Sequence, residues 1–347
     1  MIYSKLGHTD IEISKICLGT MTFGEQNTEK EAHEQINFAI EHGVTFIDTA
    51  EMYPVPPNPK TQGLTEKYIG TWIKKYNKRK DVIIASKVTG PSSDLSYIRN
   101  PLGINKKNIE IAITKNLKRL NTDYIDLYQI HWPERQTNYF GELNYKYTKD
   151  NKNKIIDNIN ESYETLNNLV LSGKIRSIGL SNDTSWGAMK FLDIAKEKKY
   201  SKIVSVQNPY SLLNRLYEIN MAEIAEIENI KLLAYSPLGF GILTGKYINN
   251  PPKNARLSLW NVFDRYSNQN AKNATLKYVN LAKKYNLSPT QLALSFVNQQ
   301  PFVASNIIGA TNLSQLKENI NSIDIKLSKE ILDEIDIINK SHPNPAP

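Results

Sequence analysis

The feature that most constrains the fold is the regular alternation of eight short apolar runs with longer amphipathic segments. The runs are rich in β-branched residues and span Ile16–Gly19, Val44–Ile47, Val82–Ser86, Tyr124–Ile130, Ile175–Leu180, Ile203–Val206, Lys231–Ala234 and Asn306–Ile308. The segments between them are long enough to form helices. Strand–helix alternation builds a parallel sheet, and eight such units close it into a barrel. The sequence therefore predicts an α/β protein with the (β/α)8, or TIM-barrel, fold.

Polar side chains stand at or just past the ends of these predicted strands. They are Thr20, Asp48, Lys87, His131, Ser181–Asn182, Gln207–Asn208, Tyr235–Ser236 and Gly309–Thr311. In a barrel of this kind the carboxyl ends of all the strands face the same way, and active sites lie on that face. We therefore expect these residues to meet on one rim, although they are scattered along the chain.

The other predicted elements complete a single barrel domain over residues 1–347. Lys5–Ser14 alternates around a Gly-His-Thr-Asp turn, which predicts a hairpin in residues 1–14 that plugs the barrel floor. A capping box at Thr28 and Glu31 and a first-turn proline at Pro289 mark two helix starts. The predicted helices are a segment from Thr28 to His42, Leu64–Tyr76, Lys106–Leu120, Asp157–Leu171, Trp186–Lys198, Glu218–Glu228, two pieces within 271–300, Leu313–Ile320 and Lys329–Ile338. Residues 341–347 are expected to form a loosely ordered tail.

Three connections are too long for simple turns, and each follows a strand end: Pro54–Gly63, Trp132–Ile156 and Pro237–Gln269. Long loops within a compact domain are usually lids or binding segments. The second connection contains Trp132, Tyr139, Phe140, Tyr145 and Tyr147. These aromatics are suited to an apolar wall beside a substrate; alternatively, they pack the loop against its own barrel.

Length and charge limit the classes of partner. No Gly/Ser-rich or Pro-rich linker divides the 347 residues into two cores. The formal net charge of +8 comes with interspersed acids, so a solubilising surface is the simpler interpretation. Attraction of an anionic ligand, such as a nucleotide phosphate, is the alternative. No basic stripe with interleaved aromatics points to nucleic acid, and the outer helices show no unambiguous apolar patch that predicts an oligomer.

The chain carries the signs of a cytoplasmic protein. Cys17 is its single cysteine, so no intrachain disulfide can form. The start, MIYSKLGHTDIEIS, lacks the apolar core of a signal peptide, and no apolar run is long enough to cross a bilayer. We therefore expect a cytoplasmic location and no membrane partner. No metal site is expected.

Four residues on the predicted rim each have a simple structural interpretation. Asp48 could cap a helix, Tyr53 could pack in its loop, and His131 could be a core residue. Lys87 is harder to explain in this way, because it ends a buried apolar strand and its charge would be desolvated there without a partner. Asp48 is the obvious partner.

Together the four residues make a coherent proton-transfer site. A phenol is normally a poor acid near neutral pH, since its pKa is about 10. The Lys87 ammonium is expected to lower the pKa of Tyr53, while Asp48 holds and neutralises Lys87. Tyr53 could then donate a proton to a developing alkoxide, and His131 could polarise the carbonyl oxygen by a hydrogen bond. Such a site lacks a hydride, which must come from a cofactor.

The rim motifs resemble those of the aldo-keto reductase superfamily, and most closely its bacterial Tas-type branch, which is related to potassium-channel β subunits. The motifs run in the family's order over residues 1–340 and are GTMTFG (19–24), DTAEMY (48–53), ASK (85–87), IHWP (130–133), GKIRSIGLSN (173–182), QNPYSLLNR (207–215), AYSPLGFGILTGKY (234–247) and IIGATNLSQLKEN (307–319). The resemblance implies that Asp48, Tyr53, Lys87 and His131 form the catalytic tetrad. In channel β subunits the histidine position is commonly replaced.

The resemblance also implies NADP(H), bound without a Rossmann fingerprint. The glycine cluster Gly239, Gly241 and Gly245 enters a long loop and not an early βαβ helix, so it is no such fingerprint. In the family the cofactor lies extended across the barrel mouth. The implied roles are nicotinamide amide contacts by Ser181, Asn182 and Gln207; ring stacking by Tyr235; pyrophosphate contacts by Ser236, Pro237, Leu238 and Gly241; phosphate charge at Lys246 and Arg256; adenosine contacts by Gly309, Thr311, Gln315, Glu318 and Asn319; and further cofactor contacts by Gly19, Thr20 and Met21.

Simple physical arguments fit these implied roles. Thr311 precedes the helix predicted from Leu313, and a helix amino terminus favours phosphate. Arg and Lys suit the 2′-phosphate that separates NADP from NAD. By themselves, Gln207 could belong to an ordinary turn and Lys246 could be a solvated surface charge.

Three functions compete at this stage. The leading hypothesis is an NADPH-dependent reductase of aldehydes or ketones, with a small-molecule carbonyl substrate and Tyr53 as the acid. The second is a nucleotide-sensing regulatory subunit, like the channel β proteins. The third is a barrel isomerase or lyase that uses the same groups without nicotinamide.

Overall fold

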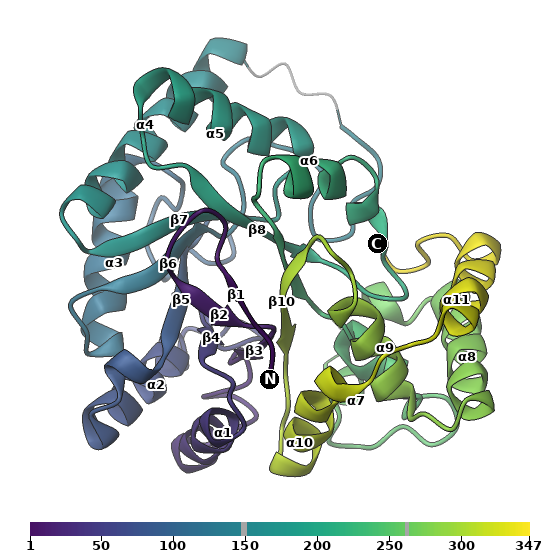
Figure 1. Cartoon of the computed structure of the whole chain (residues 1–347). Helices are drawn as coiled ribbons and strands as arrows, with labels where there is room; N and C mark the ends of the chain where they lie inside the picture. The colour runs from purple at the N-terminus through teal and green to yellow at the C-terminus, as the bar shows by residue number, and fades with distance from the viewer. Residues whose placement is uncertain (147–150, 261–263) are drawn as a thin grey trace.

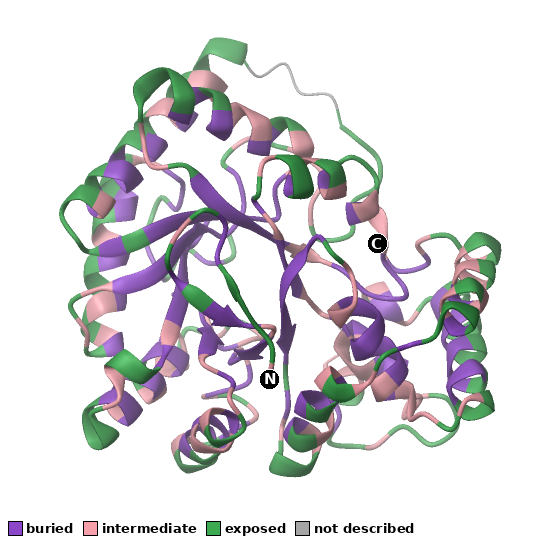
Figure 2. Cartoon of the chain, viewed as in Figure 1, coloured by how far each residue is buried: buried purple, intermediate pink, exposed green. Residues whose placement is uncertain are grey.

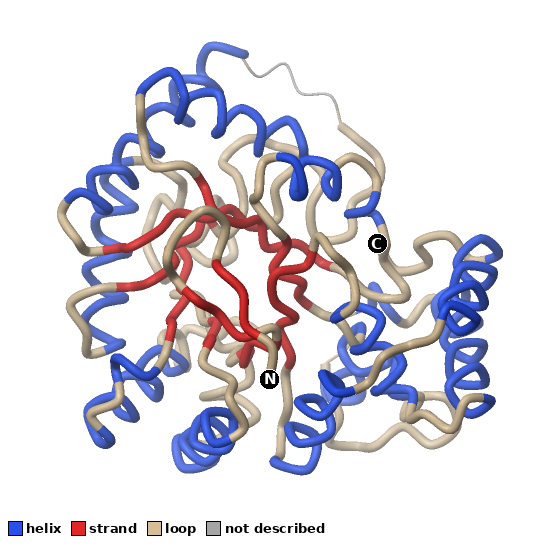
Figure 3. Tube along the Cα trace, viewed as in Figure 1, coloured by secondary structure: helices blue, strands red, loops and turns tan. Residues whose placement is uncertain are grey.

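The predicted closed barrel is confirmed. The computed structural model describes residues 1–146, 151–260 and 264–347. Eight parallel strands close in the order β10-β3-β4-β5-β6-β7-β8-β9. Their bounds are β3 Ile16–Gly19, β4 Phe46–Asp48, β5 Ile83–Val88, β6 Ile125–Ile130, β7 Ile175–Ser181, β8 Ile203–Pro209, β9 Leu232–Tyr235 and β10 Val303–Ile308. The strands form the centre of the molecule and the helices surround them (Figures 1 and 3).

The helices follow the predicted alternation closely. They are α1 Glu29–Glu41, α2 Leu64–Tyr76, α3 Lys106–Leu120, α4 Lys152–Leu171, α5 Ser185–Lys198, α6 Met221–Ile227, α7 Arg256–Leu259, α8 Gln269–Lys284, α9 Pro289–Asn298, α10 Leu313–Asn321 and α11 Lys329–Ser341. The capping box of Thr28 and Glu31 is present at α1, and Pro289 stands in the first turn of α9 behind the cap Ser288. The sequence signals at these two helix starts are therefore confirmed.

The amino-terminal hairpin covers one end of the barrel. Strands β1 Tyr3–Lys5 and β2 Glu12–Ser14 pair antiparallel, and Figure 1 shows them across the barrel centre. Leu6 and Ile13 are fully buried and pack with Cys17, Phe46 and other residues of the barrel interior. This apolar contact makes the hairpin the floor of the barrel, as predicted, and leaves the opposite end for a site.

The core lies between the strands and the inner faces of the helices. In Figure 2 the strands are buried along most of their length, while the outer helix faces are exposed. The side chains that fill this layer are mainly Ile, Leu, Val and Ala. Within the described ranges, no helix is long and apolar enough to cross a membrane.

The carboxyl-terminal tail differs from its prediction. Residues 341–347 were expected to be loosely ordered, yet Ala346 is fully buried and its N–H donates to the Leu213 carbonyl oxygen at 3.1 Å. The Asn344 side chain accepts a hydrogen bond from the Arg215 N–H at 2.6 Å, and the Pro345 carbonyl accepts one from Asn268 at 2.8 Å. These contacts hold the tail against the barrel. No periodic pattern in the sequence predicts them.

Candidate active site

Three neighbouring strands bring the predicted catalytic residues together. Asp48 ends β4, Lys87 lies in β5, and His131 directly follows β6. The Lys87 ammonium donates to Oδ2 of Asp48 at 2.7 Å and to the Thr49 carbonyl oxygen at 2.8 Å. Lys87 and Asp48 are almost completely buried. The predicted partnership of Asp48 with Lys87 is therefore present in the structure.

Tyr53 lies in the segment between β4 and α2 and faces the same point. Its ring centre is 5.0 Å from Nζ of Lys87 and 5.8 Å from the His131 ring, to which it stands edge-on. The Tyr53 N–H donates a hydrogen bond to the Ala50 carbonyl, and the Tyr53 carbonyl accepts one from the Gly63 N–H. The four residues thus gather at the carboxyl end of the barrel.

The protonation states differ in part from the prediction. Burial, with a smaller contribution from the Asp48 charge, holds the pKa of Tyr53 well above its usual value. The expectation of a lowered pKa is wrong for this structure, because desolvation of the phenolate outweighs the opposing charge of Arg256. Burial, and then the Lys87 charge, holds the pKa of His131 well below its usual value. At neutral pH the site therefore holds a protonated phenol and a neutral imidazole.

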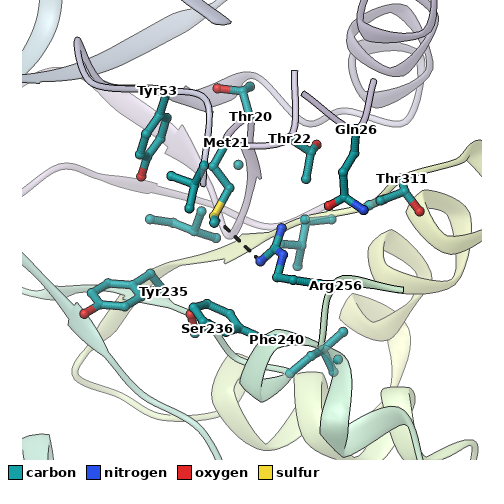
Figure 4. A pocket seen from close by; sticks show the side chains of 18 of the residues that line it. Thr20, Met21, Thr22, Gln26, Tyr53, Tyr235, Ser236, Phe240, Arg256 and Thr311 are labelled. Carbon is teal, nitrogen blue, oxygen red and sulfur yellow. Dashed lines mark hydrogen bonds between the residues drawn. The ribbon is translucent and has the colours of Figure 1, made fainter. Parts of the chain in front are cut away.

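A large cavity opens beside these residues. Its volume is about 980 Å³, and Asp48, Tyr53 and His131 line it. All the residues for which the resemblance implied cofactor contacts also line it: Gly19, Thr20, Met21, Ser181, Asn182, Gln207, Tyr235, Ser236, Pro237, Leu238, Gly241, Lys246, Arg256, Gly309, Thr311, Gln315, Glu318 and Asn319. Figure 4 shows part of this lining, with Tyr53 and Tyr235 facing the same space as Arg256. Three of the four predicted catalytic residues and all the predicted cofactor residues thus share one cavity, and Lys87 contacts it only through its partner Asp48.

Hydrogen bonds connect the polar groups at the end of the cavity nearest His131. The Tyr235 hydroxyl donates to Oδ1 of Asn182 at 2.6 Å, and the Asn182 amide donates to the His131 carbonyl at 2.9 Å. The Ser181 hydroxyl donates to the Gln207 carbonyl at 2.8 Å. The sequence placed Gln207 just past its strand, but it is part of β8 and pairs with Leu233 of β9.

Two cations lie farther along the cavity without a carboxylate partner among the described residues. Burial lowers the pKa of both Lys246 and Arg256, and the charge of Arg256 lowers that of Lys246 further. The Arg256 guanidinium lies over the Phe240 ring at 5.1 Å, and its Nε is buried with no hydrogen-bond partner in the described chain. A desolvated pair of cations with unused donors is suited to a phosphate group.

The far end of the cavity is formed by the turn before α10. A Cβ added to Gly309 would meet no atom within 4 Å, so this glycine leaves open space. The Gln315 side chain accepts from the Thr311 N–H at 3.0 Å, and Asn319 donates to the Gly309 carbonyl at 3.0 Å. Gln315 and Asn319 therefore hold the turn itself, next to the amino terminus of a helix.

Side chains of the long connection after β6 form an apolar wall beside Tyr53 and His131. Trp132 and Phe140 line the cavity and contact each other edge-on, with ring centres 5.5 Å apart. Tyr139 instead packs against a small apolar cluster, and Tyr145 is exposed. Tyr147 lies outside the described residues. The aromatic loop thus combines both predicted alternatives, a wall and a self-packed segment.

Several other residues that line the cavity were not named as candidates. Val55, Pro56, Pro57 and Arg265 lie within the predicted binding connections Pro54–Gly63 and Pro237–Gln269, whereas Met52, Ser92, Asp94 and Leu95 lie outside them. Leu95 belongs to residues 90–104, whose buried Leu95, Ile98 and Leu102 form one cluster with Trp132. That recurrence of apolar residues at intervals of three and four positions was the available signal for a packed segment over the mouth.

Comparison with known proteins agrees with this geometry. The model of the Aldo/keto reductase family matches residues 15–340. Protein tas of Escherichia coli is 48% identical over 349 residues, which covers 100% of both chains. The uncharacterized oxidoreductase YrpG of Bacillus subtilis is 32% identical, covering 100% of this chain and 97% of its own. A probable voltage-gated potassium channel subunit beta of Arabidopsis thaliana is 28% identical, covering 99% of this chain and 98% of its own.

Proposed function

Because this chain belongs to the aldo/keto reductase family of oxidoreductases, we propose that it is an NADPH-dependent reductase of small aldehydes or ketones. The observation that carries the proposal is the buried Lys87–Asp48 pair beside Tyr53 and His131, at the mouth of a barrel whose cavity is walled by apolar side chains.

The proposed chemistry assigns one task to each side chain. Tyr53 holds its proton at neutral pH, since burial keeps its pKa high, and gives it to the carbonyl oxygen as negative charge develops there. The neutral His131 positions and polarises that oxygen. Asp48 compensates the charge of Lys87. NADPH, when bound, supplies the hydride that the carbonyl carbon accepts, so that the product is an alcohol.

The choice of NADPH rests on the residues that would hold its phosphates. Lys246 and Arg256 offer two positive charges without a carboxylate partner in the described chain, and such charges favour the 2′-phosphate. Gly309 leaves room for the adenosine end, and Tyr235 presents a ring beside the Asn182 amide. These features fit an extended dinucleotide across the mouth.

An NADPH-consumption screen over chemically varied aldehydes, ketones and quinones tests the proposal, with Tyr53→Phe as the diagnostic variant. We expect turnover by the wild type, a loss of about 10²–10⁴-fold in Tyr53→Phe, and unchanged quenching of tryptophan fluorescence by NADPH. Tyr76→Phe, which removes an exposed hydroxyl on α2, is the control. Equal turnover by Tyr53→Phe and the control would refute Tyr53 as the acid.

The resemblance to channel β subunits motivates a second candidate, a nucleotide-sensing regulatory subunit. The two candidates differ in turnover. A chain that binds NADPH tightly, reduces no carbonyl in the screen and retains a stable protein partner on an affinity column would favour the regulatory function.

A further inference from the structure

A second buried ion pair lies next to the catalytic residues and has no part in the chemistry described above. Glu51, two positions before Tyr53, is fully buried. Both its carboxylate oxygens accept from the Arg99 guanidinium, at 2.6 and 2.8 Å, and one also accepts from the Thr89 N–H at 2.6 Å. Arg99 is itself only 8% exposed.

This carboxylate joins the two strand ends that carry the catalytic pair. Glu51 follows Asp48 by three residues beyond β4, and Thr89 follows Lys87 by two residues at the end of β5. The Glu51 backbone is tied as well, since its carbonyl accepts from the Gln62 side chain. The segment that carries Tyr53 is therefore held at Glu51 through both the side chain and the backbone carbonyl of that residue.

The guanidinium, in turn, belongs to the substrate wall. Arg99 lies in residues 90–104, whose Leu95, Ile98 and Leu102 pack against Trp132 in one apolar cluster with Met52 at its edge. Leu95, Met52 and Trp132 also line the cavity beside Tyr53. One ion pair therefore links the proton donor to the wall against which a substrate would rest.

A contribution to the stability of the fold is a weak explanation for a buried ion pair such as Glu51–Arg99. The desolvation of two buried charges offsets much of their attraction, and well-packed apolar replacements are often equally stable or more so. A forked guanidinium–carboxylate contact fixes distance and orientation more closely than apolar packing does. Proton transfer demands that accuracy, because a misplacement of about 1 Å can cost about 100-fold in rate.

We propose that Glu51 and Arg99 are positioning residues that set Tyr53 relative to the carbonyl substrate. This inference rests on the proposed function, in which Tyr53 is the proton donor. Loss of the Arg99 guanidinium is expected to lower kcat and raise KM for the carbonyl compound. The reason is that the Tyr53 segment and the segment of Leu95 would no longer be joined by the Glu51–Arg99 ion pair. NADPH binding is expected to stay unchanged, because neither residue lines the cavity.

The test compares Arg99→Met with Arg79→Met. Arg79 is a matched control because it also donates to a buried carboxylate, Asp126, at 2.7 Å, and Asp126 likewise accepts from a strand N–H, that of Ile84, at 2.9 Å. This second cluster lies at the opposite ends of strands β5 and β6, away from the cavity. Both variants lose a guanidinium that is mostly buried, with side chains 5% and 13% exposed for Arg99 and Arg79. Asp126 keeps a second cation, Arg176, at 2.7 Å, so Arg79→Met reports the loss of one guanidinium from a buried carboxylate far from the cavity.

We measure Tm, the Kd for NADPH, and kcat and KM for one small and one bulky carbonyl substrate found in the screen, at a temperature where each variant is folded. Arg99→Met should lose about 10- to 100-fold in kcat with its NADPH Kd within about twofold of the wild type, and Arg99→Lys should recover part of that loss. Arg79→Met should lower Tm with kcat within about twofold. Wild-type kcat in Arg99→Met, or equal losses in both variants, would overturn the positioning role alone. A wild type without carbonyl turnover would overturn the proposed function and this role with it.

Discussion

Gln207 donates a hydrogen bond from Nε2 to Oδ1 of Asp48, 2.8 Å away, while Lys87 donates to the other oxygen at 2.7 Å. Both oxygens of this buried carboxylate are therefore bonded to side chains of different strands. The resemblance assigned Gln207 to the nicotinamide amide. In the structure its amide satisfies one oxygen of the Asp48 carboxylate and fixes the orientation of that carboxylate.

Replacing Gln207 by Leu should destabilise the fold. The substitution leaves one buried oxygen of Asp48 without its partner, which costs about 1–3 kcal/mol. Gln35→Leu is the matched control, because neither polar atom of the buried Gln35 side chain has a hydrogen-bond partner in the described chain. Urea denaturation should show a lower free energy of unfolding for Gln207→Leu only. Equal values for the two variants would contradict a stabilising bond to Asp48.

The buried His131 should make stability depend on pH. Its pKa in the folded chain lies well below the ordinary value of 6.5. Below about pH 6.5 the unfolded chain therefore binds a proton that the folded chain excludes, so this contribution to stability is present above 6.5 and is lost as the pH falls. The slope from one such group is at most about 1.4 kcal/mol per pH unit. Urea denaturation between pH 5 and 7 should give a shallower decline for His131→Gln, and parallel curves would contradict the assignment.

Removing the Arg256 charge should weaken NADPH binding more than NADH binding. A charge-assisted hydrogen bond to phosphate contributes about 1.5–3 kcal/mol, so Arg256→Gln should raise the NADPH Kd by about 10- to 100-fold. Lys253→Gln removes a nearby exposed charge outside the cavity and serves as the control. Fluorescence titration with both nucleotides measures the preference. An equal loss for NADH and NADPH would show that Arg256 does not select the 2′-phosphate.

The fold was predictable because each barrel strand is a short apolar run that must be buried on both faces. β3 has the predicted bounds, and the other strands differ by a few residues. The start of α4 shows the limit of this pattern. It begins at Lys152 and not at Asp157. Ile155 lies four positions before Ile159 and packs against the core, so the apolar spacing itself continues ahead of Asp157. Only the polar residues 152–154, which the Asn151 side chain caps, lay beyond what hydrophobic spacing could reveal.

The candidate site residues at strand ends were predictable from the sequence. The residues whose position depends on contacts between loops were not. Asp48, Lys87 and His131 follow from strand positions. The apolar spacing of residues 90–104 marks a packed segment, but the contact of Arg99 with Glu51 joins residues 48 positions apart, and no local pattern encodes that contact. The pKa of Tyr53 was also out of reach, because it depends on how completely the phenol is buried.

The docked tail gives the last prediction. Ala346 is fully buried between the barrel and residues that precede α8, and its N–H is bonded to Leu213. Ala346→Asp would bury a carboxylate in the apolar core cluster to which Ala346 belongs, so it should lower the free energy of unfolding by about 2–3 kcal/mol. Pro343→Asp places the same charge three residues earlier at an exposed position and should change stability by less than about 0.5 kcal/mol. Thermal and urea denaturation distinguish the two variants, and equal stability would mean that the tail is as loosely held as the sequence predicted.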